Sequence, residues 1–391
     1  MNSQNTPVHI RLWHHDFWRM AVANLLLTVA VYMLVPTMPQ WLMETQGLSA
    51  LESGIAMGAF GVGLFVFGAF VSFLVQHYRR NVVCIWAVLA MAALIGSLYY
   101  INTYRAEFVD FSLVVLQRLA LGAVFGLAQM VLTSTLIIDT CESYQRTEAN
   151  HSAGWFGRFA LSIGPLAGLL LQRLAGFDYV VLAAGGVAVV AVVLIWLVNF
   201  PFRAPEDDIP TVSLDRFFLP HGFPLFVNLQ LIMLATGLLF SLPLHERFYA
   251  MMMVGFLFAL LAQRFVFRNA EVKSEVVTGL ILLGAALLMM LTHPQPIVWY
   301  IAPVFVGFSL GIIGSRFMLF FIKLSRHCQR GTSQSTFMLG WESGIAWGLG
   351  IGLAVFQAES VPVLVTALIL VVCALVLYHF THNWFVRNKN R

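Results

Sequence analysis

Four charged residues lie deep inside long apolar segments of the sequence, and they are the first candidates for chemistry. They are Arg118, Arg158, Arg316 and Glu342. A charge in an apolar environment is costly unless it is paired or used, so such residues mark candidate functional sites. An arginine can hold a carboxylate or phosphate group with two parallel hydrogen bonds, and a carboxyl group can carry a proton. The pattern predicts binding of a charged solute, with Glu342 as the first and Asp139 as the second candidate proton carrier.

No catalytic or metal-ligating pattern accompanies these charges. The sequence contains no H-E-x-x-H, G-x-S-x-G or P-loop motif, and its eleven histidines fall in loops or near the ends of apolar segments. The cysteines are far apart and form no C-x-x-C pair; they are Cys84, Cys141, Cys328 and Cys373. We therefore expect reduced thiols, no metal, no cofactor and no histidine proton relay. A membrane-embedded enzyme would have to use His14-His15-Asp16, for which the amphipathic start of a helix is the simpler explanation.

The composition indicates that lipid is the solvent for most of the chain. Hydrophobic residues make up 60% of the 391 positions and charged residues only 10%. An average soluble domain carries roughly 25% charged residues, so a soluble protein of this size could not cover its surface. The basic residues are scattered through short loops and form no stripe with aromatics, which argues against nucleic-acid binding.

Apolar runs of spanning length recur along the chain, separated by short polar loops. A membrane-spanning helix needs about 20 residues. The predicted spans are 17–42, 53–75, 82–101, 109–138, 150–172, 179–200, 223–242, 248–267, 274–292, 297–325, 331–357 and 361–382. The predicted fold is all-α, an integral membrane protein of twelve transmembrane helices in two pseudo-symmetric six-helix bundles. Residues 1–200 form the N-terminal bundle, 201–222 a polar cytoplasmic linker, and 223–391 the C-terminal bundle.

The distribution of basic residues predicts the orientation. With the N-terminus in the cytoplasm, sixteen of the 22 Lys and Arg residues fall on that side. Only Arg105, Arg173 and Arg247 fall on the other side, and this bias favours cytoplasmic termini. The first apolar run is too long for a cleavable signal peptide. We expect a bacterial-type inner membrane location, with both termini cytoplasmic.

The two halves of the sequence resemble each other. Gly154-Trp155 in the fifth predicted span recurs as Gly340-Trp341 in the eleventh, 186 positions later. Gly164 recurs as Gly350 at the same offset. Two parallel repeats joined by a polar linker are typical of transporters. The glycines of the second and eleventh spans are expected to allow close helix packing.

Three motifs make the chain similar to the major facilitator superfamily of secondary transporters over essentially its whole length. Arg79-Arg80-Asn81-Val82 lies in the second-to-third loop, where the family has a basic motif. Val75 and Tyr78 stand where the family usually has Asp and Gly. Arg118-Leu-Ala-Leu-Gly122 resembles the family's Arg-x-x-x-Gly pattern, and Gly164-Pro165-Leu-Ala-Gly168 resembles part of its Gly-Pro motif.

The resemblance implies alternating access, with a small-molecule solute and the lipid bilayer as the only partners, and we expect a monomer. The third, sixth, ninth and twelfth spans would be outer helices, and they carry no deep charge. Arg79, Arg80 and Asp139 are the gating-loop candidates. Polar residues on path-lining helices are further site candidates, although a helix–helix hydrogen bond is the simpler explanation for each of them: Asn24, Tyr32, Gln129, Asn228 and Gln230.

The depths of the charges predict the solute. Arg316 and Glu342 lie at similar depths on consecutive helices, so we expect them to pair. That pair leaves Arg118 and Arg158 unmatched near the midplane, where such folds bind substrate. We therefore expect an anionic or zwitterionic organic solute, with proton coupling open. The alternatives are an efflux antiporter of drugs or other lipophilic compounds, a lipid-handling protein and a membrane-embedded enzyme.

Overall fold

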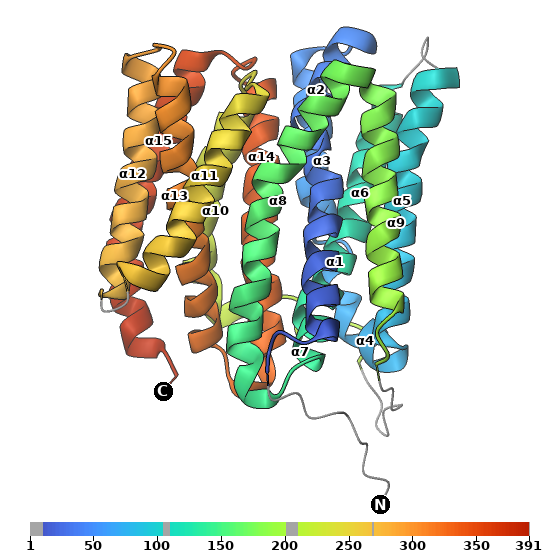
Figure 1. Ribbon diagram of the computed structural model, residues 1–391, viewed down its shortest axis with the longest axis vertical. Helices are drawn as coiled ribbons and strands as arrows, with labels where there is room; N and C mark the ends of the chain where they lie inside the picture. Colours follow the sequence, from blue (N-terminus) through green and yellow to red (C-terminus); the bar gives the residue numbers. More distant parts are fainter. Residues whose placement is uncertain (1–10, 105–109, 201–209, 268–269, 391) are drawn as a thin grey trace, which may run out of the picture.

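The computed structural model describes residues 11–104, 110–200, 210–267 and 270–390, and its long segments are helices lying side by side (Figure 1). The longer helices are α1 (His15–Tyr32), α2 (Leu34–Gln40), α3 (Ala50–Gly63), α4 (Val71–His77), α5 (Arg80–Tyr104), α6 (Phe111–Val131), α8 (Arg146–Ala175), α9 (Phe177–Trp196), α10 (Phe223–Phe240), α11 (Glu246–Phe265), α12 (Val272–Thr292), α13 (Val298–Leu324), α14 (Arg330–Ala354) and α15 (Ser360–Asn388). The predictions made for Arg105 and for residues 201–209 lie outside the described ranges.

Eleven of the described segments are long and apolar enough to cross a membrane, by length and composition. They confirm the all-helical membrane fold. The segment predicted as the eleventh span is α14, which is 25 residues long and buried along most of its length. It is not one of those eleven segments, so the count of twelve spans stays a prediction.

Both ends of the described chain lie at one face of the molecule. Figure 1 shows α1 beginning and α15 ending at the bottom, where the short helix α7 (Ile137–Asp139) also lies. We call this the terminal face and the other the opposite face. An even number of spans requires this arrangement, as the sequence predicts.

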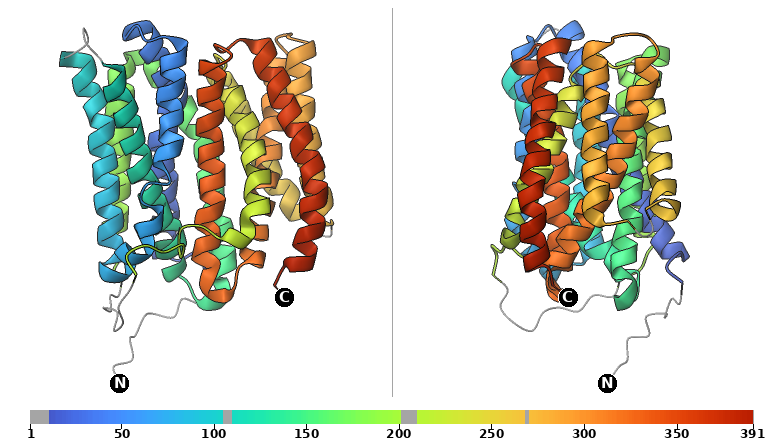
Figure 2. Two further views of the ribbon diagram at one scale, coloured as in Figure 1. Left: turned by 180° about the vertical axis from the view of Figure 1, so that it is seen from behind. Right: turned by 90° about the vertical axis from the view of Figure 1, so that its left-hand side faces the viewer.

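Two seams join the helices of the first half to those of the second. One seam packs α3 against α14 (Figure 2), and the other packs α8 against α11 (Figure 1). In the first seam a Cβ atom at Gly54 would lie 2.5 Å from the Gly350 carbonyl oxygen, so only glycine fits there. This close approach is the packing role expected of the glycines. We propose 1–200 and 223–391 as the two bundles that these seams connect.

The second predicted span, 53–75, is not one continuous helix. α3 ends at Gly63, and the chain passes through turns and a 3₁₀ turn at Gly68–Phe70 before α4 begins. The apolar run Leu64–Phe67 hides this break in the sequence. The fourth span also departs from regular α-helix, because a π-helical turn, Leu132–Leu136, separates α6 from α7. Such turns are frequent at functional sites.

Candidate functional site

Tyr32 and Glu342 meet near the middle of their long helical segments and connect the two halves of the molecule. Tyr32 is the last residue of α1, and Glu342 lies at the centre of α14. The Tyr32 hydroxyl donates a hydrogen bond of 2.8 Å to Glu342 Oε2, and both side chains are buried. Two small pockets lie beside Glu342, which lines both of them, and Tyr32 lines one.

The first pocket contains Arg118 and has a volume of about 20 Å³. Arg118 is buried, with its guanidinium carbon 5.0 Å from the centre of the Phe60 ring. Its Nε and Nη1 atoms have no hydrogen-bond partner within the described residues. Two N–H donors of the Arg118 guanidinium therefore lie in the same pocket as Glu342 without a hydrogen-bond acceptor among the described residues.

The second pocket contains Arg158 and has a volume of about 40 Å³. Arg158 is buried, and its guanidinium stacks 4.2 Å from the centre of the Trp155 ring. None of its three guanidinium nitrogens has a hydrogen-bond partner among the residues that the structure describes. A buried charged donor without a hydrogen bond is costly, so the unpartnered nitrogens of Arg158 need an explanation.

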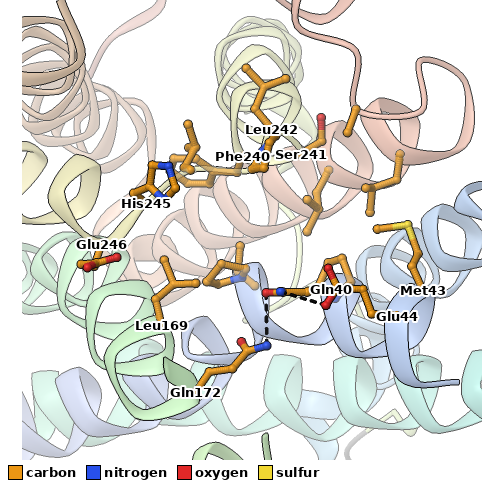
Figure 3. Close-up of a pocket in the computed structure, with 18 of the residues that line it drawn as sticks. Gln40, Met43, Glu44, Leu169, Gln172, Phe240, Ser241, Leu242, His245 and Glu246 are labelled. Atoms are coloured by element: carbon orange, nitrogen blue, oxygen red, sulfur yellow. Dashed lines mark hydrogen bonds between the residues drawn. The ribbon is translucent and has the colours of Figure 1, made fainter. Parts of the chain in front are cut away.

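A larger cavity of about 740 Å³ lies at the opposite face (Figure 3). We call it the vestibule, and it is lined by the opposite-face ends of α2, α8, α10 and α14. Its volume is in the range of ligand pockets, whereas each small pocket holds only a few water molecules. Val35 and Leu349 line both the vestibule and the Arg118 pocket, so they separate the two spaces.

Polar residues of the vestibule bond to one another across its rim. Gln40 donates to Glu44 at 3.0 Å, and Gln172 donates to Gln40 at 3.2 Å (Figure 3). Arg173 of α8 forms an ion pair with Glu246 of α11, which closes the seam between these helices at the opposite face. The vestibule thus has hydrogen-bonded polar residues at its rim and the apolar residues Val35 and Leu349 at its inner end.

The terminal face is closed below the Arg158 pocket. A Cβ atom at Gly331 of α14 would lie 2.7 Å from the Ser134 carbonyl oxygen in the π-helical turn. His151 of α8 bonds to Ser315 of α13 at 2.6 Å. These contacts close the terminal face, while at the opposite face the vestibule lies beside the close contact of Gly54 with Gly350 and the Arg173–Glu246 pair.

Of the three gating-loop candidates, two form an ion pair and the third is exposed. Arg80 forms an ion pair with Asp139, so these two predicted residues do meet at the terminal face. Arg79 is exposed to solvent. Arg216 of the linker lies close to the Arg80–Asp139 pair, and its burial, together with the Arg80 charge, lowers the pKa of Arg216 below its usual value.

The predicted pair of Arg316 and Glu342 is wrong. Arg316 Nε and Nη2 lie 2.7 and 2.6 Å from Glu275 Oε2, and Glu275 is fully buried in the first turn of α12. The ninth predicted span therefore carries a buried charge at its end, in the first turn of α12, and not deep in the membrane. Glu342 lines the pockets of both Arg118 and Arg158, so a carboxylate does lie near these two arginines.

The polar site candidates fall into two groups. Asn228 donates to the Ala374 carbonyl of α15 at 3.0 Å, and Gln230 contacts the Ser343 hydroxyl of α14 at 3.1 Å. Both make helix–helix hydrogen bonds away from the two small pockets. Asn24 and Gln129 line the Arg158 pocket, where the Asn24 side-chain oxygen has no partner among the described residues.

Aromatic residues of the site were missed by the sequence analysis. Trp155 stacks on Arg158, while Trp341 and Phe337 line the same pocket. Trp155 and Trp341 are the two tryptophans of the repeated Gly-Trp pair, so this repeat is the feature of the sequence that could have identified them as site residues. Phe60 covers the Arg118 guanidinium from α3.

The family comparison agrees with this architecture. The family model of the Major Facilitator Superfamily matches residues 20–349. The chain belongs to the major facilitator superfamily. It is therefore an integral membrane protein and a secondary transporter of small solutes. A search of curated proteins gives no match.

Solved structures of several transporters share the fold at low sequence identity. The human organic anion transporter MFSD10 (TETRAN) is 15% identical, with a TM-score of 0.68 over 93% of this chain and 98% of that chain. An auto-inhibited POT family peptide transporter is 13% identical, with a TM-score of 0.67 over 97% and 98%. A bacterial homologue of the iron transporter ferroportin, in an outward-facing state, is 17% identical, with a TM-score of 0.64 over 93% and 98%.

Proposed function

We propose that this superfamily member carries a small organic anion or zwitterion by alternating access, through the site between Arg118 and Arg158. Two buried guanidinium groups flank one carboxylate, so positive charge exceeds negative charge in the site. A carboxylate or phosphate group on the solute would supply the missing acceptors. The solute of the structurally similar organic anion transporter agrees with this charge class.

The observation that carries the proposal is the Arg158 guanidinium. It is buried, it faces a pocket, and its three nitrogens lack partners among the described residues. Its aromatic neighbours Trp155, Phe337 and Trp341 provide no carboxylate or carbonyl acceptor from their side chains. The small pocket volumes require the two halves to separate slightly before an organic solute fits, as alternating access demands.

The proposed setting is a bacterial-type inner membrane, with the terminal face in the cytoplasm. The excess of basic residues at that face supports this orientation. The vestibule would then open to the cell exterior. The protein would act as a monomer.

Ligand-induced thermal stabilisation of the purified protein tests the proposal. We expect organic anions or amino acids to raise the melting temperature, because a ligand present at 100 times its Kd stabilises the native state by about 2.7 kcal/mol. Sugars and cationic dyes should have no effect. Arg158→Gln should abolish the stabilisation, and Arg118→Gln should weaken it.

Arg264→Gln is the matched control, because Arg264 lies exposed at the end of α11. It should respond to ligands like the wild type. Stabilisation by cationic dyes alone, unchanged by Arg118→Gln and Arg158→Gln, would overturn the anion proposal. That result would favour the second candidate, efflux of lipophilic cations, for which Glu342 beside the aromatic residues Phe337 and Trp341 is the supporting observation.

Reporter fusions test the proposed orientation. Fusions after Glu52, Asp178 and Glu359 should report an external location, because these residues lie at the opposite-face ends of α3, α9 and α15. Fusions after Asp207 and Arg391 should report the cytoplasm. An internal signal from the Glu359 fusion would contradict twelve spans with both termini inside.

A further inference from the structure

The last part of the linker is bound between the two halves of the molecule at the terminal face. The Ser213 amide donates to the Ala69 carbonyl oxygen at 2.9 Å, next to the break between α3 and α4. A few residues later, the Leu219 amide donates to Thr336 Oγ1 of α14 at 2.8 Å. The segment Ser213–Leu219, which we call the strap, therefore contacts the first half at one end and the second half at the other.

Asp215 binds both halves with one carboxylate. Ser72 of α4 donates to Asp215 Oδ2 at 3.2 Å, and Thr332 of α14 donates to Asp215 Oδ1 at 2.9 Å. The Thr332 hydroxyl in turn accepts a hydrogen bond of 2.8 Å from the Arg216 amide. Hydrogen bonds to an ionised acceptor are stronger than those between neutral groups. The bridge holds only while the terminal ends of α4 and α14 stay close together.

Phe217 fills a notch at the break between α3 and α4. A Cβ atom at Gly68 would lie 2.0 Å from the Phe217 ring, so the absence of a side chain at Gly68 makes room for that ring. Arg216, just before it, has a φ of 58°, a left-handed conformation that L residues rarely adopt. A non-glycine residue keeps this conformation where contacts compensate its cost. The strap is therefore held in one specific conformation rather than lying loosely on the surface.

We propose that the strap is a conformational lock that stabilises the state closed at the terminal face. Opening that face separates α4 from α14, which breaks the Asp215 bridge and withdraws Phe217 from the Gly68 notch. The lock thus sets the balance between the two access states of the proposed transporter. The inference rests on the proposed function only in requiring alternating access, and it holds for any solute.

Cysteine labelling in lipid nanodiscs tests the lock without any solute. The four natural cysteines are first replaced by Ser or Ala. Ser134→Cys then reports opening at the terminal face, because Ser134 is buried against Gly331. In a separate protein, Met43→Cys reports closure of the vestibule, which Met43 lines. A maleimide reagent gives the labelling rate of each.

We expect Asp215→Ala and Phe217→Ala each to raise the Ser134→Cys labelling rate roughly tenfold and to lower the Met43→Cys rate, as a population shift requires. Val212→Ala, at an exposed residue just before the strap, is the control and should change neither rate. Asp215 is partly exposed, so the Asp215→Ala protein is expected to fold even where Phe217→Ala does not. Unchanged rates would overturn the lock. A faster Ser134→Cys rate without a slower Met43→Cys rate would also overturn it, because that pattern indicates local loosening.

Discussion

Arg316→Gln is expected to lower the free energy of unfolding by about 3–5 kcal/mol, the loss typical of breaking a buried ion pair. The substitution removes both donors that bind Glu275 Oε2 and leaves a carboxylate that is only 1% exposed. The other oxygen, Oε1, already lacks a partner within the described residues. An unpaired buried charge therefore remains in the first turn of α12. Denaturant or thermal unfolding in detergent measures the loss.

A double-mutant cycle separates the pair from general damage to the helices. Glu275→Gln combined with Arg316→Gln should be less destabilised than the sum of the two single variants, because neither charge is then left alone. The matched control is Arg19→Gln, which breaks the exposed pair of Arg19 and Asp16 at 2.9 Å. Exposed pairs contribute about 0–1 kcal/mol, so this variant should be near neutral. Strictly additive losses at Arg316 and Glu275 would show that the two residues do not interact.

This ion pair shows what depth along a helix can and cannot predict. Counting residues along the helices places Arg316 and Glu342 at similar depths, but depth says nothing of the direction in which a side chain points around its helix. α13 packs along α11 and α12, and Arg316 points towards α12. Glu275 was overlooked because it lies in the first turn of its helix. A long arginine side chain reaches such a residue from deeper in the membrane.

The spans themselves were predictable for a simple physical reason. In lipid each backbone amide must be satisfied within its own segment, so long apolar runs become helices wherever they occur. The break at Gly63–Phe70 was not predictable in this way, because the run stays apolar through it and contains no proline. At the break, Gly68 packs beside Phe217, which is about 150 residues away in the chain.

The site was predictable in its charges but not in its arrangement. Arg118, Arg158 and Glu342 were identified because charge is rare in apolar segments. Their aromatic neighbours Trp155 and Phe60 gave no such signal, since aromatic residues are common throughout the chain. The contact of Tyr32 with Glu342 joins positions in opposite halves, and only the packing of the two halves sets that distance.

The second large effect is expected at Glu342, which should make binding of the solute anion depend on pH. Glu342 lines both arginine pockets, so its negative charge competes with the solute anion for the guanidinium groups. Protonation of Glu342 removes that competition, and anion affinity should therefore rise as pH falls. By linkage, the bound anion in turn favours proton uptake by Glu342. A unit charge at short range in a partly buried site is worth a few kcal/mol, so we expect a change of at least roughly tenfold.

Measuring anion affinity by thermal stabilisation between about pH 5 and pH 8 tests this expectation. Proteins tend to be most stable within this pH range. Glu342→Gln, which mimics the protonated side chain, should bind the anion tightly at every pH. Tyr32→Phe removes the hydrogen bond to Glu342 and should alter the pH at which affinity changes. His151 is the other titratable group near Arg158, and His151→Gln is the control. A pH dependence that persists in Glu342→Gln but disappears in His151→Gln would assign the proton to the histidine and contradict a coupling role for Glu342.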